Sequence, residues 1–326
     1  MVKNYQRLFF ENRGIRQTIF KNTFWLMWSE FFAKGIAFFI FIWLARHFGP
    51  EIYGQWAFAL SFVSLFVILI DFGFSTLTIR ELARDKLKYS QYVDNILAMK
   101  LVLGLASLGL IAFLIQFLGK EQEVIRLVYF LALYVIINNF TTFFQSIFRA
   151  YEKMQYETIC KAVQNLSLLG LSAFFILTDG SILAISYAYV GAVLIGFLCS
   201  FVLLWSHFPK FFLKVDWKIC REILGKTWPF LFSGIFYMIY FRIDSTMLGI
   251  FSDMKEVGYY NAAFNLFIAI FIIPEIITMS FFPKMSYFYK KDKEKLKQIF
   301  SNFKSLLAII GLPLAAFLLL FSNVII

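Results

Sequence analysis

The chain is poor in the residues that build metal sites, disulfide frameworks and water-exposed surfaces. Among its 326 residues are two His, three Cys and six Pro, and only 16% are charged. Cys160, Cys199 and Cys220 are far apart in sequence and form no C-x-x-C pair, so we interpret them as small apolar residues. Without a Cys/His cluster or an H-E-x-x-H motif, we expect no metal, and we predict no other cofactor.

Apolar residues are abundant, at 60% of the chain, and they occur in long runs. A bilayer core about 30 Å thick needs about 20 apolar residues per crossing helix, and a soluble fold has no use for so many runs of this length. The sequence therefore predicts an all-α fold, a polytopic transmembrane helix bundle. The nine predicted spans are 23–46, 56–79, 93–118, 124–148, 159–178, 182–206, 227–250, 257–282 and 305–326.

The positive charges follow the same plan. Most of the 31 Lys and Arg fall at the N-terminus and in every second loop between spans. By the positive-inside rule, this predicts a multi-pass protein of the cell inner membrane with a cytoplasmic N-terminus. The net charge of +11 is spread over several short loops, so it indicates contact with anionic membrane lipids and no nucleic acid.

The order of the spans predicts two lobes joined by a linker. Residues 1–205 form a six-helix N-terminal lobe, 206–226 a cytoplasmic amphipathic linker helix, and 227–326 an incomplete C-terminal lobe of three helices. The turns after the first and seventh spans resemble each other, with aromatic and small residues in both. This weak sequence similarity indicates a parallel repeat, an arrangement common among secondary transporters, although aromatic membrane turns can also be alike by chance.

Several short motifs stand out along the chain: Gly49-Pro50-Glu51-Ile52-Tyr53-Gly54, Asp71-Phe72-Gly73 followed by Arg80-Glu81, Phe148-Arg149-Ala150-Tyr151-Glu152-Lys153, Arg242-Ile243-Asp244-Ser245-Thr246-Met247-Leu248-Gly249, Val257-Gly258-Tyr259-Tyr260-Asn261-Ala262-Ala263 and Phe282-Pro283-Lys284-Met285-Ser286. Together they resemble the polysaccharide flippases of the Wzx type (O-antigen and capsule flippases), which belong to the multidrug/oligosaccharidyl-lipid/polysaccharide exporter superfamily. The resemblance implies 12 to 14 spans in two lobes around a central cavity. With nine spans, the sequence is expected to be C-terminally truncated.

The resemblance also implies a function: moving a polyprenyl-diphosphate-linked oligosaccharide from the cytoplasmic to the outer leaflet for surface polysaccharides such as lipopolysaccharide, with ion coupling. Expected partners are this substrate, membrane lipids, a polysaccharide polymerase and glycosyltransferases. A polar head crossing the bilayer needs a polar cavity, so ionisable groups inside spans are the candidate site residues.

Candidate substrate-binding residues lie in three spans. Glu30 and Lys34 are four residues apart on one face of the first span; Lys34 could hold a diphosphate that Glu30 tunes, or the two could neutralise each other. Arg242 suits bidentate phosphate binding, with an interhelical ion pair as the alternative. Asn138 and Asn139 could bind sugar hydroxyls or join neighbouring helices.

Three carboxylates are candidates for ion coupling, namely Asp71, Glu275 and Asp244. Burial raises a carboxylate's pKa, which suits Asp71 and Glu275 to protonation linked to conformational change, with snorkelling or helix capping as the alternatives. Asp244 is two residues from Arg242 and so faces another side of its helix, where a structural role is expected. Lys100 is expected to snorkel toward the interface.

Two further function classes remain. A cation-coupled multidrug exporter of the same superfamily is the main alternative, because the charges within spans are balanced and do not decide between them. An enzyme such as a glycan polymerase or ligase is disfavoured, since every predicted outer loop is shorter than the large loop that such enzymes need. We therefore predict a transporter and not an enzyme.

Overall fold

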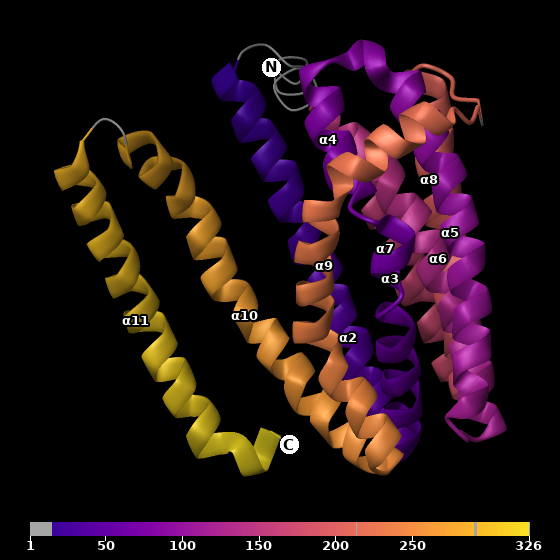
Figure 1. The fold of residues 1–326 in the computed structure, drawn as a ribbon. Coiled ribbons are helices and arrows are strands. Elements are labelled where there is room, and N and C mark those ends of the chain that lie inside the picture. Colours follow the sequence, from indigo (N-terminus) through magenta and orange to yellow (C-terminus); the bar gives the residue numbers. More distant parts are fainter. Residues whose placement is uncertain (1–14, 213, 290–291, 326) are drawn as a thin grey trace. The chain divides into compact units, whose positions relative to one another are not determined.

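The computed structural model describes residues 15–212, 214–289 and 292–325, and in these ranges the chain forms helices and no strand. The expectation of an all-α helix bundle is confirmed. Figure 1 labels most of the elements. Their bounds are α2 Ile15–Ser64, α3 Val67–Asp71, α4 Phe74–Arg84, the short 3-10 helix η1 Lys86–Lys88, α5 Tyr89–Phe117, α6 Gln122–Ala150, α7 Met154–Leu177, α8 Ile182–His207, α9 Trp217–Phe251, α10 Met254–Tyr289 and α11 Lys293–Ile325.

Six segments of the described chain are long and apolar enough to cross a membrane. They are Lys21–Arg84, Lys86–Phe117, Gln122–Ala150, Met154–Leu177, Ile182–His207 and Lys293–Ala316. The first merges two predicted spans, and the others match the third to sixth and the ninth. The predicted seventh and eighth spans lie in α9 and α10, which are helical but are not among these six.

Two backbone breaks shape the first 84 residues. Gly49 has a positive φ of 73° directly before Pro50, and this non-helical residue kinks α2 between the first two predicted spans. The second predicted span is itself discontinuous. Phe72 (φ 49°) and Gly73 (φ 80°) are left-handed, and they end α3 and precede α4.

The chain divides into two compact units, Met1–Gly258 and Tyr259–Ile326. The second unit holds most of α10 and all of α11. The predicted linker at 206–226 lies within the first unit, and the two-lobe boundaries remain a prediction.

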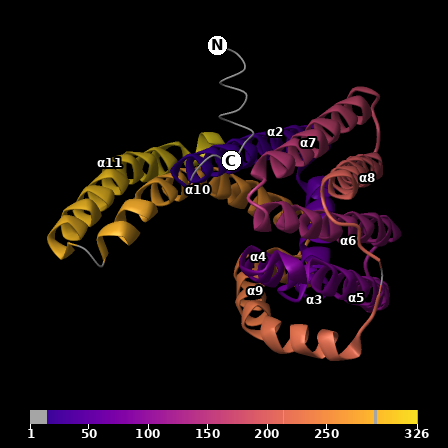
Figure 2. The ribbon, with the colours of Figure 1, turned by 90° about the horizontal axis from the view of Figure 1, so that it is seen from above.

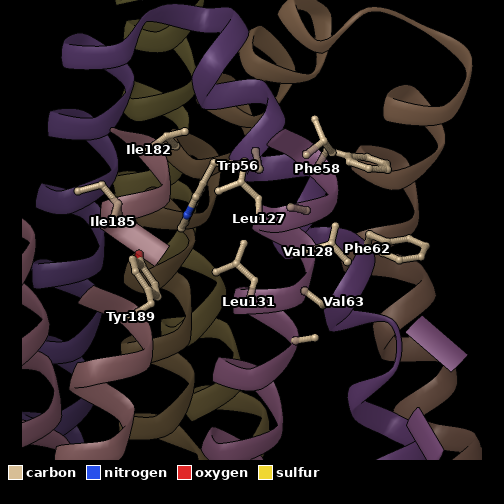
Figure 3. Close-up of a cluster of buried hydrophobic side chains, with 14 of the residues drawn as sticks. Trp56, Phe58, Phe62, Val63, Leu127, Val128, Leu131, Ile182, Ile185 and Tyr189 are labelled. Carbon is tan, nitrogen blue, oxygen red and sulfur yellow. The ribbon is translucent and has the colours of Figure 1, made fainter. Parts of the chain in front are cut away.

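Within the first unit, α7 packs against α8 and α2, and α6 packs against the same two helices. Figure 2 shows α6, α7 and α8 side by side. Buried side chains from α2, α6 and α8 form one hydrophobic cluster, in which Phe58, Leu131 and Ile185 are fully buried. Figure 3 shows how these aliphatic and aromatic groups interleave. In a membrane, such close packing and interhelical hydrogen bonds hold the bundle together, because lipid is as apolar as the core.

The linker is only partly the helix that the sequence predicted. Residues 208–212 and 214–216 are not helical, and the helix begins at Trp217, where the Asp216 side chain caps it by accepting from Lys218 N (2.9 Å). The non-helical stretch is fixed to α5 instead. Phe212 N donates to Asp94 Oδ1 (2.9 Å), and Asp216 N donates to Asn95 Oδ1 (2.7 Å). These bonds satisfy backbone donors that a helix would have satisfied itself.

From Trp217 onward, α9 continues without interruption into the seventh predicted span. Figure 1 shows its first turns crossing the end of the bundle before the helix runs alongside α2. Glu222 and Lys226, one turn apart on this first part, form an exposed ion pair of 2.6 Å. The hydrogen bond and charge of Lys226 lower the pKa of Glu222.

Candidate substrate and ion-coupling site

A buried polar cluster joins α3, α5 and α6. Lys100 is fully buried, and its Nζ donates to Asp71 Oδ1 at 3.0 Å and to Asn139 Oδ1. The ammonium group also lies 5.3 Å from the ring centroid of Phe143. The expected snorkelling of Lys100 is therefore wrong: inward-facing partners compensate a charge that would be costly in hydrocarbon.

Asp71 lies at the break in the second predicted span. It is the last residue of α3, and the Ser75 hydroxyl, on the far side of the break, donates to its Oδ1 (2.5 Å). A Cβ added to Gly73 would lie 2.6 Å from Phe230 Cβ of α9, so glycine is needed there for space as well as for its positive φ. The break thus brings a carboxylate into the bundle, bonded on one side to α4 and on the other to α5.

A second charged cluster joins α2, α6 and α7 through four side chains. Arg149 donates to the fully buried Glu157 through Nε (2.7 Å) and a second guanidinium nitrogen (2.5 Å). Lys161 lies 2.9 Å from Glu157 and 2.6 Å from Glu30. Glu30 therefore pairs with α7, so its predicted pairing with Lys34 along α2 is not needed to neutralise it. The cluster alternates in sign, which compensates each buried charge.

Asn138 and Asn139, the two amides predicted to bind sugar hydroxyls or to join helices, take part in contacts with different helices. Asn139 accepts from Lys100 in the buried cluster, whereas Asn138 accepts from Gln164 Nε2 of α7 at 3.1 Å. Gln164 in turn fills the space beside Gly196 of α8. Both amides join helices, and their predicted contact with sugar hydroxyls stays a prediction.

Arg242 of α9 is coupled electrostatically to three tyrosines. Its guanidinium is within electrostatic reach of the hydroxyls of Tyr53, Tyr134 and Tyr237. Tyr134 packs edge-on against Tyr189 at 5.2 Å between ring centroids, and Tyr189 packs on Trp56 at 5.3 Å. This arrangement places one cation within electrostatic range of tyrosines contributed by α2, α6 and α9. We call Arg242, Tyr53, Tyr134 and Tyr237 the Arg242 cluster.

The remaining candidate residues are less informative. Asp244 is exposed on another face of α9 than Arg242, as its spacing predicted, and Lys34 is half-buried on α2. The side chain of Glu275 lies outside the described residues. Within the described part of the chain, no group of three or more His, Cys, Asp or Glu side chains could hold a metal ion.

The two turns that resemble each other in sequence touch in the structure. A Cβ on Gly54 would lie 1.7 Å from Met254 O, and one on Gly258 would lie 1.9 Å from Pro50 O. The backbones therefore meet through the two glycines of the similar motifs. The parallel repeat itself stays a prediction.

Some residues of these clusters were missed at the sequence level. From the sequence, Lys161 is counted only among the loop charges, Arg149 is placed only in a family motif and beside a loop, and Glu157 is not singled out. The spacing of Glu157 and Lys161, at i and i+4, is the signal that could have found them. No local pattern indicates that Lys100 faces Asp71, 29 residues away, or that three tyrosines lie within electrostatic range of Arg242.

Comparisons with known proteins agree with this architecture. Three solved structures share the fold, with coverage given for this chain and then for the other. An inward-facing multidrug resistance MATE family transporter of the MOP superfamily has a TM-score of 0.62, 17% identity and coverage of 90% and 70%. A MOP superfamily transporter from Pyrococcus furiosus, described as having a binding pocket of reverse polarity, has a TM-score of 0.61, 18% identity and coverage of 98% and 74%. A MATE protein in complex with MaL6 has a TM-score of 0.58, 17% identity and coverage of 98% and 75%.

No curated protein matches this chain. The sequence model of a family described as "Polysaccharide biosynthesis protein" matches residues 19–289, which is most of the chain and includes the buried Asp71–Lys100 pair, the charged cluster around Glu157 and the Arg242 cluster. With this match and the multi-pass helical fold that it shares with MOP superfamily transporters, the chain belongs to the polysaccharide biosynthesis protein family.

Proposed function

We propose that this protein flips a polyprenyl-diphosphate-linked oligosaccharide of the Wzx type from the cytoplasmic to the outer leaflet. The observation that carries the proposal is the Arg242 cluster, in a chain whose family is named for polysaccharide biosynthesis. A guanidinium binds two phosphate oxygens at once, and tyrosines offer hydroxyls to sugars and flat faces to their rings. A diphosphate-linked sugar needs both kinds of group.

In this proposal, ion coupling uses the buried ion pair of Asp71 and Lys100, which lies in the same compact unit as Arg242. Protonation of Asp71 would remove the partner of Lys100 and leave an uncompensated cation between α3, α5 and α6. The uncompensated charge would raise the free energy of this helix arrangement relative to another one. A proton can drive transport through such a shift between two arrangements. Asp71 therefore remains the leading coupling candidate.

The test starts from deletion of the gene in its host. Lipid-diphosphate-linked oligosaccharide should accumulate in the cytoplasmic leaflet, and a plasmid copy should reverse the accumulation. Arg242→Ala should lower flipping by roughly tenfold to a hundredfold, the value of one or two charge-assisted hydrogen bonds, and Arg242→Lys should restore only part of it. Arg126→Ala, at an exposed position on α6, is the matched control and should flip normally.

The second candidate function is multidrug export, which is what one structural neighbour is named for. A positive guanidinium beside the tyrosines disfavours cationic drugs, because like charges repel strongly where water is excluded. Unchanged lipid-linked sugar in the deletion strain, together with new drug sensitivity, would replace the flippase proposal by this one.

A further inference from the structure

Two pockets follow the contact between α2 and α7 at the end of the bundle predicted to be cytoplasmic. The first has a volume of about 460 Å³, and the charged and amide side chains of Asn22, Lys86, Arg149 and Glu152 are among its lining residues. The second, of about 130 Å³, lies farther along the same helices and is mostly apolar, with Trp28, Phe32 and Ile36 on α2 and Leu166 on α7 among its lining residues.

The two pockets lie on one continuous seam. Its α2 side is formed by residues spaced at three and four, which places them on one helix face, and its α7 side has the same spacing. The α2 residues are Asn22, Leu26, Ser29, Ala33 and Ile36, and the α7 residues are Met154, Thr158, Lys161 and Asn165. Between the pockets, Thr158 Oγ1 donates to Trp25 O (3.0 Å) and fastens the two helices.

The polar pocket carries chemistry for a phosphate head. The Lys86 ammonium lies 5.2 Å from the Tyr151 ring centroid, and in the described part of the chain no ion pair with a carboxylate holds it. Arg149 contributes a guanidinium whose remaining donors are not used by Glu157. Glu152 brings a negative charge to the same pocket, and this charge also interacts with the buried Lys21.

A buried amide in the same pocket has an unsatisfied atom. Asn22 is 7% exposed, it lines the pocket, and its Oδ1 accepts no hydrogen bond from the residues that the structure describes. A buried acceptor without a donor costs about 1–3 kcal/mol, so a ligand that supplies one is favoured. The hydroxyls of a glycerol head group are such donors.

The second pocket carries chemistry for a hydrocarbon chain. Trp28, Phe32 and Leu166 at its rim are 50%, 45% and 58% exposed, so the groove opens sideways to lipid. From Asn22 to Ile36, α2 rises about 21 Å at 1.5 Å per residue, which equals the depth of one leaflet with its head groups. The groove volume suits part of one chain.

From this arrangement we infer that the α2–α7 seam binds one anionic phosphoglyceride of the predicted cytoplasmic leaflet, with its phosphate at Lys86 and Arg149, its glycerol hydroxyls at Asn22 and one acyl chain along Ala33 and Leu166. The site is separate from the Arg242 cluster and does not depend on the proposed transport activity. A bound lipid there would hold α2, the kinked first helix, against α7.

The test measures lipid binding to the purified full chain by native mass spectrometry in detergent. Phosphatidylglycerol should bind at least about tenfold more tightly than diacylglycerol, which lacks the phosphate, because one charge-assisted hydrogen bond is worth that much. Inorganic phosphate alone should not displace it, since the chain contributes to binding. Equal binding of diacylglycerol, or displacement by inorganic phosphate, would overturn the inference.

Variants locate the site. Lys86→Gln and Ala33→Phe should each weaken phosphatidylglycerol binding by roughly tenfold, one by removing the charge and the other by filling the groove. Lys88→Gln and Ala37→Phe, at nearby positions that do not line either pocket, should bind within about twofold of the parent. If Ala33→Phe does not fold, the exposed Ala162→Phe on α7 replaces it.

The lipid source is decided in the same experiment. If undecaprenyl phosphate binds more tightly than phosphatidylglycerol and is sensitive to the same substitutions, the phosphoglyceride assignment is wrong and the seam is a site for a polyprenyl carrier. If Lys86→Gln and the variant that fills the groove both bind phosphatidylglycerol like the parent, the seam binds no lipid.

Discussion

The buried pair of Asp71 and Lys100 gives the sharpest prediction, because its two partners differ in exposure. The Lys100 side chain is 0% exposed and that of Asp71 is 22% exposed, with 3.0 Å between Nζ and Oδ1. Removing one partner of a buried ion pair costs about 3–5 kcal/mol, because the other charge is left uncompensated. The two single substitutions should therefore cost unequal amounts.

Asp71→Asn should be the more destabilising change. It leaves the Lys100 ammonium fully buried against Asn139 and the Phe143 ring, with no negative charge beside it, so its cost should approach ~5 kcal/mol. Lys100→Met leaves Asp71 with the Ser75 hydroxyl and some access to solvent, so its cost should lie nearer ~3 kcal/mol.

The double variant completes the cycle. Removing both charges leaves no uncompensated ion, so Asp71→Asn combined with Lys100→Met should be more stable than Asp71→Asn alone. At about 2–4 °C per kcal/mol, the single variants should melt roughly 6–20 °C below the parent. The assay is thermal unfolding of the purified protein in detergent, followed by intrinsic fluorescence, with the four proteins in one buffer.

Two results would refute this reasoning. Single variants that melt with the parent would mean that the pair is not buried as described. A double variant whose loss equals the sum of the two single losses would mean that Asp71 and Lys100 do not interact.

Three further outcomes are expected. Gly73→Ala should lower the melting temperature, because the added Cβ meets Phe230 and the positive φ disfavours alanine, whereas Gly109→Ala, with open space around it, should be neutral or stabilising; equal melting temperatures would contradict the close contact. Cys160 and Cys199, with sulfurs 3.6 Å apart, should form an α7–α8 disulfide under a mild oxidant, seen as loss of two labelled thiols; two free thiols after oxidation would contradict the geometry. Glu222→Gln should change the free energy of unfolding by less than about 0.5 kcal/mol, because its ion pair with Lys226 is exposed. The pKa of Glu222 is lowered in the folded state, so its small contribution to stability is present above pH 4.5 and lost as the pH falls below it. Unfolding of parent and variant measured at several pH values would show this.

The sequence by itself determined the class of the protein. Long apolar runs require helices in a bilayer, because every backbone polar group must be satisfied within the segment, and the described helices lie over the predicted spans, of which the second is broken at Phe72 and Gly73. Local signals also indicated the glycine turns around Gly54 and Gly258 and the presence of charges inside spans such as Asp71 and Arg242. Each of these signals depends on neighbours within a few residues.

Only the tertiary structure decided what those charges contact. The spacing of Glu30 and Lys34 allowed either a diphosphate site or a pair along one helix, and the structure places Lys161 of α7 2.6 Å from Glu30. Lys100 could reach either the interface or the interior, and the position of α3 beside α5 decided for the interior. The physical reason is that a long side chain in a helix bundle can reach partners on several helices. Which of these helices lie beside it depends on packing contacts between segments far apart in the chain.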